Sequence, residues 1–226
     1  GADDDRMAGA TGNDMLLGES GNDVLLGGEG ADTLRGQGGN DTIFAGDGDD
    51  RLIGGMGEDL LAGDTGNDRV LGDGGRDRLI GGAGHDTLDG GWDDDERWGN
   101  GGSDLLIGGG GNDRLRGGMD SDSLDGGEGD DTLTGHADDW LEGGAGADRF
   151  TLPGDAVGSG PATLADFRAD EDRIELVVPQ NRLADAQVTV EPQDDGTALV
   201  LLNGEPVAMV LDGRGLEAGM IGVRAA

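Results

Sequence analysis

A nine-residue repeat constrains this chain more than any other feature. Residues 54–80 read GGMGEDLLA GDTGNDRVL GDGGRDRLI, three units without a gap. In each unit Gly holds the first and fourth places, Asp the sixth and an aliphatic residue the eighth. A short fixed period of this kind is typical of solenoids, in which each unit packs only against its neighbours.

The same phase runs from Gly1, where a unit is already under way, to residue 151. Nonapeptides begin at Gly9 and continue to the unit that begins at Gly126; an eight-residue unit begins at Gly135 and the last unit at Gly143. A Gly-rich disordered tail would not need an aliphatic residue two places after each Asp, so a folded repeat is favoured over disorder. The sixth place is Asp in all 17 units: Asp5, Asp14, Asp23, Asp32, Asp41, Asp50, Asp59, Asp68, Asp77, Asp86, Asp95, Asp104, Asp113, Asp122, Asp131, Asp139 and Asp148.

Each place of the unit has a physical task. Gly at places one, two and four permits positive φ and close backbone approach, which predicts a turn over places one to six. Places seven to nine are then expected to form a short strand with the eighth residue inward. Two units make one coil, so units n and n+2 stack about 4.8 Å apart. The eighth-place residues would form an apolar ladder that ends at Phe150.

The charge of the chain requires cations. Its 226 residues carry a net charge of −34 and include 51 Gly, three Phe, three Trp and no Tyr, too little apolar surface for unaided collapse. Stacked Asp side chains would repel one another, and Ca²⁺ accepts six to eight oxygen ligands. Seventeen units form at most 15 pairs of units n and n+2, and 15 Ca²⁺ would bring 30 positive charges. We therefore expect up to about 15 calcium ions.

Composition also excludes several classes of partner. All 15 basic residues are Arg, against 49 acidic residues, which argues against nucleic acid or an anionic membrane as partner. No apolar run approaches the ~20 residues of a membrane span. There is no Cys and no recognisable signal peptide. The chain opens in mid-repeat, so we expect it to be the later part of a longer protein. We also expect it to be monomeric in solution.

The repeat resembles that of the RTX (repeats-in-toxin) family of secreted bacterial proteins. The resemblance implies an all-β fold: a right-handed parallel β-roll over 1–151 and a C-terminal β cap over 152–226. It also implies a ligand set for each ion, with carbonyls from places two and four plus the Asp of one turn, and carbonyls from places one and three plus the Asp of the stacked turn. The expected side-chain ligands are the sixth-place aspartates other than Asp95 and Asp139. The expected carbonyl ligands are Gly12, Gly21, Gly27, Gly28, Gly30, Gly36, Gly38, Gly39, Ala45, Gly46, Asp47, Gly48, Gly54, Gly55, Met56, Gly57, Gly63, Thr65, Gly66, Gly72, Gly74, Gly81, Ala83, Gly109, Gly111, Gly126 and Glu128.

Two units break the pattern. In Gly90–Trp98, Asp93 replaces the fourth-place Gly and Arg97 stands where an inward aliphatic residue belongs. An inward Arg is expensive unless paired, so we expect a local bulge with Trp92 or Trp98 covering the ladder. The acidic run there is either an altered cation site or a solvated excursion. Because that unit lacks its fourth-place Gly and 135–142 lacks the place itself, calcium sites should be missing or distorted around 93–97 and 137–139.

The repeat ends at residue 151, and PATLADFRADEDRIEL (161–176) resembles the segment that follows the repeats in RTX proteases and lipases. Asp166 and Asp172 could complete the last calcium sites or serve as turn and cap residues. Apolar alternation predicts strands at 186–190, 198–202 and 207–211, with Asn203-Gly204 as a hairpin turn. Residues 219–226 stand where the family carries a type I secretion signal. An open roll end needs such a cap, and Phe167 is expected to contact Phe150.

Motifs for catalysis are absent from the sequence. It has no HExxH, no GxSxG and no Lys for a P-loop, and its two His residues, His85 and His136, fall in turns. We therefore expect a non-enzymatic module that folds on calcium binding after type I secretion and supports a larger extracellular protein. Two alternatives remain: the C-terminal part of a secreted protease, lipase or epimerase, or an adhesion or ice-binding roll. Third-place Thr occurs only at Thr11 and Thr65, which argues against ice binding.

Overall fold

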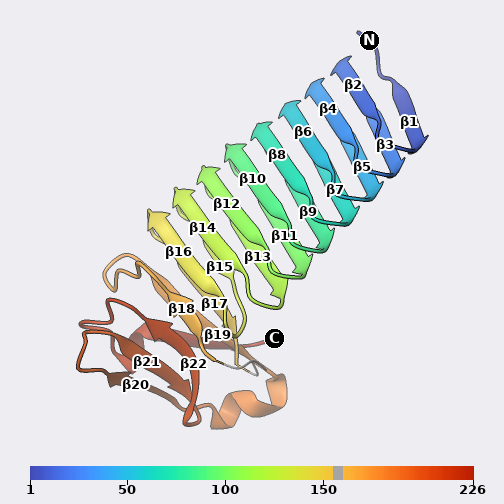
Figure 1. The fold of residues 1–226 in the computed structure, drawn as a ribbon. Helices are drawn as coiled ribbons and strands as arrows, with labels where there is room; N and C mark the ends of the chain where they lie inside the picture. Colours follow the sequence, from blue (N-terminus) through green and yellow to red (C-terminus); the bar gives the residue numbers. More distant parts are fainter. Residues whose placement is uncertain (155–159) are drawn as a thin grey trace.

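A computed structural model describes residues 1–154 and 160–226. The chain winds back and forth between two facing sheets, and successive coils stack along one axis (Figure 1). The first sheet has 11 strands and the second has 12, and strands alternate between them throughout the repeats. The fold is therefore a parallel β-roll, as the repeat predicts.

Odd-numbered strands of the repeats build the first sheet. They are β1 (Arg6–Thr11), β3 (Val24–Glu29), β5 (Thr42–Asp47), β7 (Leu60–Thr65), β9 (Arg78–Ala83), β11 (Glu96–Gly101), β13 (Arg114–Met119), β15 (Thr132–Thr134) and β17 (Arg149–Pro153). The second sheet holds the even-numbered strands β2 (Met15–Ser20), β4 (Thr33–Gly38), β6 (Arg51–Met56), β8 (Arg69–Gly74), β10 (Thr87–Trp92), β12 (Leu105–Gly110), β14 (Ser123–Glu128) and β16 (Trp140–Ala145).

These strands are longer than the sequence predicts. A typical strand such as β6 has six residues and runs from place seven of one unit to place three of the next. Positive φ occurs at places two and four, as at Gly55 (120°) and Gly57 (129°), whereas Gly54 at place one has none. The expected six-residue turn is therefore wrong, because the left-handed residue at place two twists the strand without ending it.

Stacking follows the predicted n and n+2 rule. Met7 lies opposite Leu25 and Leu25 opposite Ile43, a constant offset of 18 residues. The eight-residue unit shortens the offset to 17, so that Ser123 pairs with Trp140, and it leaves β15 with three residues. The irregularity expected at 135–142 is confirmed, and its cause is the missing residue in the turn.

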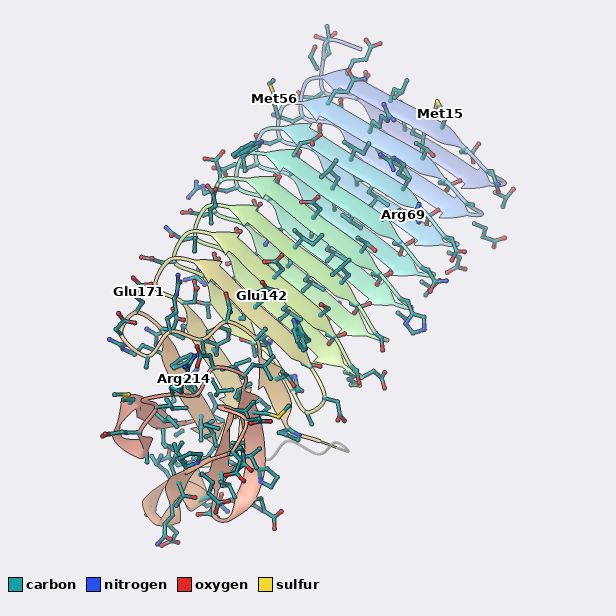
Figure 2. The ribbon with its side chains drawn as sticks, turned by 60° about the vertical axis from the view of Figure 1, so that its left-hand side comes forward. Met15, Met56, Arg69, Glu142, Glu171 and Arg214 are labelled. Atoms are coloured by element: carbon teal, nitrogen blue, oxygen red, sulfur yellow. The ribbon has the colours of Figure 1, made fainter. Side chains whose placement is uncertain are left out.

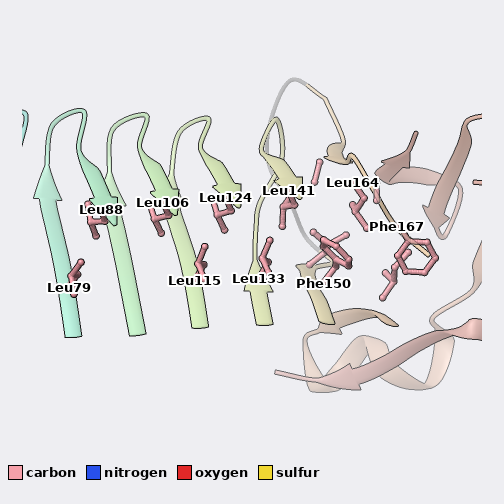
Figure 3. Close-up of a cluster of buried hydrophobic side chains, with 14 of the residues drawn as sticks. Leu79, Leu88, Leu106, Leu115, Leu124, Leu133, Leu141, Phe150, Leu164 and Phe167 are labelled. Atoms are coloured by element: carbon pink, nitrogen blue, oxygen red, sulfur yellow. The ribbon is translucent and has the colours of Figure 1, made fainter. Parts of the chain in front are cut away.

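The core is a double row of eighth-place side chains that face each other between the sheets (Figure 3). Leu79, Leu88, Leu106 and Leu115 are at most 1% exposed, and each contributes about 1.5–3 kcal/mol by burial. The row continues through Phe150 into the C-terminal segment without a break. The predicted ladder is confirmed, with Arg97 as its one charged member.

The bulge expected at Gly90–Trp98 is wrong. β11 pairs in regular register with β9 on one side and β13 on the other, and Arg97 lies opposite Leu79 and Leu115. Neither Trp covers the ladder: Trp92 is 72% exposed, and Trp98 lies on the outer face with the Arg78 guanidinium 5.2 Å from its ring centroid. Arg97 stays inside because it finds partners there.

The C-terminal segment extends both sheets. β19 (Arg173–Val178) and β23 (Ile221–Ala225) add to the first sheet in parallel, and β18 (Ala162–Leu164) and β22 (Glu205–Val210) add to the second. Antiparallel β21 (Ala198–Leu202) and β20 (Val188–Pro192) complete the second sheet, and short 3₁₀ helices span Gln180–Asp185 and Ala218–Met220.

The three strands predicted in this segment exist, with β20 two residues later than expected. The predicted hairpin joins β21 to β22, with Asn203 (φ 56°) and Gly204 (φ 87°) both left-handed. Phe150 meets Phe167 with ring centroids 6.0 Å apart, as expected. The roll therefore ends against packed side chains at this end.

Candidate metal centre

The sixth-place aspartates form two buried columns, one along each edge of the roll. The N–H of Asp41 donates to Oδ1 of Asp59 (2.7 Å), and the N–H of Asp59 donates to Oδ1 of Asp77 (2.8 Å). The same bond joins each of the other sixth-place aspartates except Asp139 to the Asp of the coil stacked on it, and Asp148 donates to Asp172 (3.0 Å). Backbone hydrogen bonding therefore fixes each sixth-place carboxylate from Asp23 onward and occupies one of its two oxygens.

The other oxygen of nearly every Asp lies buried without a partner. Because a buried anionic oxygen without compensation costs several kcal/mol, this arrangement needs a cation. Among the described residues, Oδ2 has no hydrogen-bond partner in Asp14, Asp23, Asp32, Asp41, Asp50, Asp59, Asp68, Asp77, Asp86, Asp104, Asp113, Asp122, Asp131 and Asp148.

Backbone carbonyls of the stacked coils lie close to the turn glycines, and one of them lies near this free oxygen. A Cβ placed on Gly54 would meet Oδ2 of Asp59 and would lie 2.9 Å from the carbonyl oxygen of Gly72, the first place of the next coil. A Cβ on Gly55 or Gly57 would meet a carbonyl oxygen of the preceding coil, from place two or place four. Carboxylate and carbonyl oxygens are the ligands that Ca²⁺ prefers, so the donor set fits calcium.

Third-place carbonyls already accept a hydrogen bond. The N–H of Gly39 donates to the Met56 carbonyl (2.9 Å), and the N–H of Gly57 donates likewise to the Gly74 carbonyl (2.9 Å). Each of these carbonyls keeps one lone pair for an ion. In the part of the chain that the structure describes, no three acidic or His side chains converge on a metal position, so most ligands must come from the backbone.

Burial raises the pKa of the sixth-place carboxyls from Asp41 to Asp148 in the ion-free roll. The pKa rises from 3.8 to about 6 in Asp59, to about 7 in Asp68 and to about 8 in Asp77. Desolvation is the main cause, and repulsion from the Asp of adjacent coils adds to it. The hydrogen bond from the stacked N–H acts in the opposite direction.

Protons should therefore substitute for calcium in part. A carboxyl whose pKa is raised on folding binds its proton more tightly in the folded state, so it favours folding below pH ~4 and loses that effect between pH ~6 and ~8. In chelator, we expect circular dichroism to show β structure at pH 4 that disappears by pH 8. With saturating calcium the spectrum should not change between pH 8 and 6. Identical chelated spectra at pH 4 and pH 8 would contradict this expectation.

Apart from the half-exposed Asp5, whose Oδ2 lies 3.0 Å from the Gly1 amino group, two aspartates differ from the rest, and both lie where distortion is expected. Oδ2 of Asp95 accepts a hydrogen bond from Arg97 (2.9 Å), and Oδ2 of Asp139 accepts one from the His136 N–H (2.5 Å). The reason given for the first unit is wrong, because Asp93 adopts φ 73° and keeps the turn that Gly would make. A hydrogen-bond donor at Oδ2, not a missing glycine, distinguishes this position.

The two C-terminal aspartates have different places. Asp172 continues one buried column, but its Oδ2 accepts the Arg168 N–H (2.7 Å). Asp166 accepts the N–H groups of Gly143 (2.8 Å) and Gly144 (2.7 Å), one on each oxygen. This hydrogen bonding matches the cap alternative for Asp166.

Fifth-place side chains form a second ladder that sequence analysis missed. The N–H of Asn40 donates to Oδ1 of Asn22, and the N–H of Glu58 to Oδ1 of Asn40. His85 takes part in the same way, since its Nδ1 accepts the Ser103 N–H (3.0 Å). The frequent Asn and Asp at place five were the signal for this ladder. His85 thus has a structural contact in an exposed turn.

The geometry is that of a parallel β-roll whose stacked turns hold buried carboxylate and carbonyl oxygens, a donor set that fits Ca²⁺. A family model for the RTX calcium-binding nonapeptide repeat (4 copies) matches residues 1–34, 26–61, 62–96, 98–133 and 134–152. The chain therefore belongs to the RTX calcium-binding repeat family. No curated protein matches it. No helix within 1–154 and 160–226 is long and apolar enough to cross a membrane.

Proposed function

We propose that this chain is a calcium-triggered folding module of a larger secreted protein, which it helps to export and then stabilises outside the cell. The observation that carries the proposal is the pair of columns of buried Asp Oδ2 atoms without partners. A chain with this requirement is unstable where calcium is scarce and folds where calcium is abundant. Extracellular modules bind calcium at about 10⁻⁴–10⁻³ M.

The export step fits the same physics. A type I apparatus passes an unfolded chain, and a low-calcium cytosol would keep this chain unfolded. Folding after release would then draw the chain outward. Export is tested by measuring secretion of the chain into the medium by cells that carry such an apparatus. The chain that lacks residues 219–226 serves as control. Equal secretion of both chains would contradict a signal in that segment.

Calcium binding itself is best tested by counting ions on matched variants. Asp59 borders two expected calcium positions in its column, because it stacks on Asp41 and on Asp77. Asp95 also stacks on Asp77, but its other side is held by Arg97. Asp59→Asn keeps the Oδ1 acceptor and removes the charge, so it should lose up to two ions and raise the calcium midpoint several-fold. Asp95→Asn should lose one ion at most.

Equilibrium dialysis with atomic emission measures both the ions per chain and the effect of each variant. More than ten calcium ions on the unaltered chain, with fewer on Asp59→Asn than on Asp95→Asn, is the expected result. Only one or two ions per chain would overturn the proposal. Magnesium, which requires a tighter octahedral site, should not replace calcium.

An adhesion surface is the second interpretation. Its support is a hollow on the outer face of the first sheet, with a volume near 960 Å³. Trp98, Arg116 and Arg149 line it together with Glu96 and Glu175, so it combines an aromatic ring with charged side chains of both signs. Figure 2 shows that polar side chains line the edges of the roll together with the exposed Met56.

A further inference from the structure

Arg97 is the largest fully buried side chain of the roll. It is 1% exposed and stands in the inward row between Leu79 and Leu115, where Figure 3 shows the leucines of the neighbouring coils. A guanidinium in an apolar row is destabilising unless its charge is compensated. Its contacts therefore decide what it does there.

One end of the guanidinium lies among three oxygens from two stacked units. Nη2 donates to Oδ2 of Asp95 (2.9 Å) and to the Gly108 carbonyl (2.9 Å), and it lies 3.3 Å from Oδ1 of Asp113. Asp95 is the sixth place of the lower unit. Gly108 and Asp113 are the first and sixth places of the unit stacked on it. A Cβ on Gly90 would meet this same Nη2.

The equivalent oxygens elsewhere have no such cation. In the regular pair two coils earlier, Oδ2 of Asp59 lacks a partner and the Gly72 carbonyl faces the same space. Oδ1 of Asp77, the counterpart of Asp113, is fixed there by the Asp59 N–H (2.8 Å). Arg97 thus delivers a positive charge to the oxygen set that is left open between Asp59 and Asp77.

A second guanidinium lies at the C-terminal end of the same column of aspartates. Nη2 of Arg168 donates to the Gly146 carbonyl (2.6 Å) and lies 3.8 Å from Oδ2 of Asp148 and 3.9 Å from Oδ1 of Asp172. An Arg between two stacked aspartates therefore occurs twice along this edge. The chemistry of both places is the same: a fixed cation satisfies oxygens from successive turns.

We propose that the Arg97 guanidinium is the resident cation between units 90–98 and 108–116, so that no calcium ion binds there. The inference rests on the proposed calcium function and refines it: at most 14 of the 15 positions between stacked units n and n+2 take calcium. The contact between Asp95 and Asp113 is then independent of calcium. Nε and Nη1 of Arg97 have no hydrogen-bond partner in the described residues. Once calcium is abundant, Arg97 therefore stabilises the core less than an aliphatic residue would.

The test compares Arg97→Leu with Arg116→Leu, which makes the same change at an exposed outward place on the next strand of the sheet. Arg97→Leu restores the regular inward residue and frees Oδ2 of Asp95. It should bind one calcium ion more per chain than the unaltered protein, and it should need more calcium before it begins to fold. Arg116→Leu should match the unaltered protein in ion count. An unchanged ion count in Arg97→Leu would overturn the inference.

A measurement on the unaltered protein decides the matter even if Arg97→Leu does not fold. Anomalous diffraction from crystals grown in calcium should give peaks between regular pairs such as Asp59 and Asp77 and none between Asp95 and Asp113. A calcium peak at Asp95 and Asp113 would overturn this inference alone. The absence of peaks from every turn would overturn the calcium proposal and this inference with it.

Discussion

In chelator at pH 7.5 the chain is expected to be largely unfolded, and to gain β structure and compactness as calcium reaches about 10⁻⁴–10⁻³ M. Ordering a nine-residue unit costs about 9–18 kcal/mol of backbone entropy. One buried eighth-place side chain returns only about 1.5–3 kcal/mol. Repulsion in a chain of charge −34 and the buried Oδ2 atoms oppose folding further. Ion binding must supply the difference, because site formation and folding are coupled.

Circular dichroism and small-angle scattering measure this transition together. The chelated chain should scatter as an expanded coil, and the calcium-loaded chain as a rod. Magnesium at the same concentration serves as control for ionic strength and divalent charge, and should leave the chain unfolded. A chelated chain with the spectrum and radius of the calcium-loaded chain would refute the coupling.

The regular part of the fold could be predicted because each place of the unit tolerates few residue types. Asp59 must be acidic, Leu61 must be apolar and Gly57 must accept a left-handed backbone. The coil, the stacking of units and the apolar ladder can therefore be predicted from a single sequence. The strand length could not be predicted in the same way. Places one to three continue the strand past Gly54, and the left-handed Gly55 there looks like a turn residue in sequence.

The role of Arg97 was missed because its partners are not local. Two of its three oxygen contacts, Gly108 and Asp113, come from the next coil on the same edge. An isolated inward Arg predicts a bulge, whereas an inward Arg beside a column of free carboxylate oxygens does not. The same limit applies to β19 and β23, since nothing in a short apolar run identifies its partner in a parallel sheet.

A chain that ends at Thr151 is expected to stay largely unfolded at calcium concentrations that fold the full protein. Each coil contacts only its neighbours, so growth of a roll needs an ordered surface to begin from. Residues 160–226 supply one: an antiparallel hairpin, and strands that extend both sheets of the roll. Without them Phe150 and Leu141, both fully buried in the intact protein, would lie at an open end.

Two controls separate nucleation from simple loss of chain length. Removing residues 1–17 from the other end should leave the calcium transition almost unchanged, because Met7 and Leu16 there are only partly buried.

Phe167→Ala removes the ring that meets Phe150 and should destabilise the folded state by about 3–5 kcal/mol, which raises the calcium midpoint. Phe44→Ala, at a ring that is 39% exposed on the outer face, should have little effect. If the chain ending at Thr151 folds with an unchanged midpoint in circular dichroism, the repeats nucleate themselves and the C-terminal strands only cover their end.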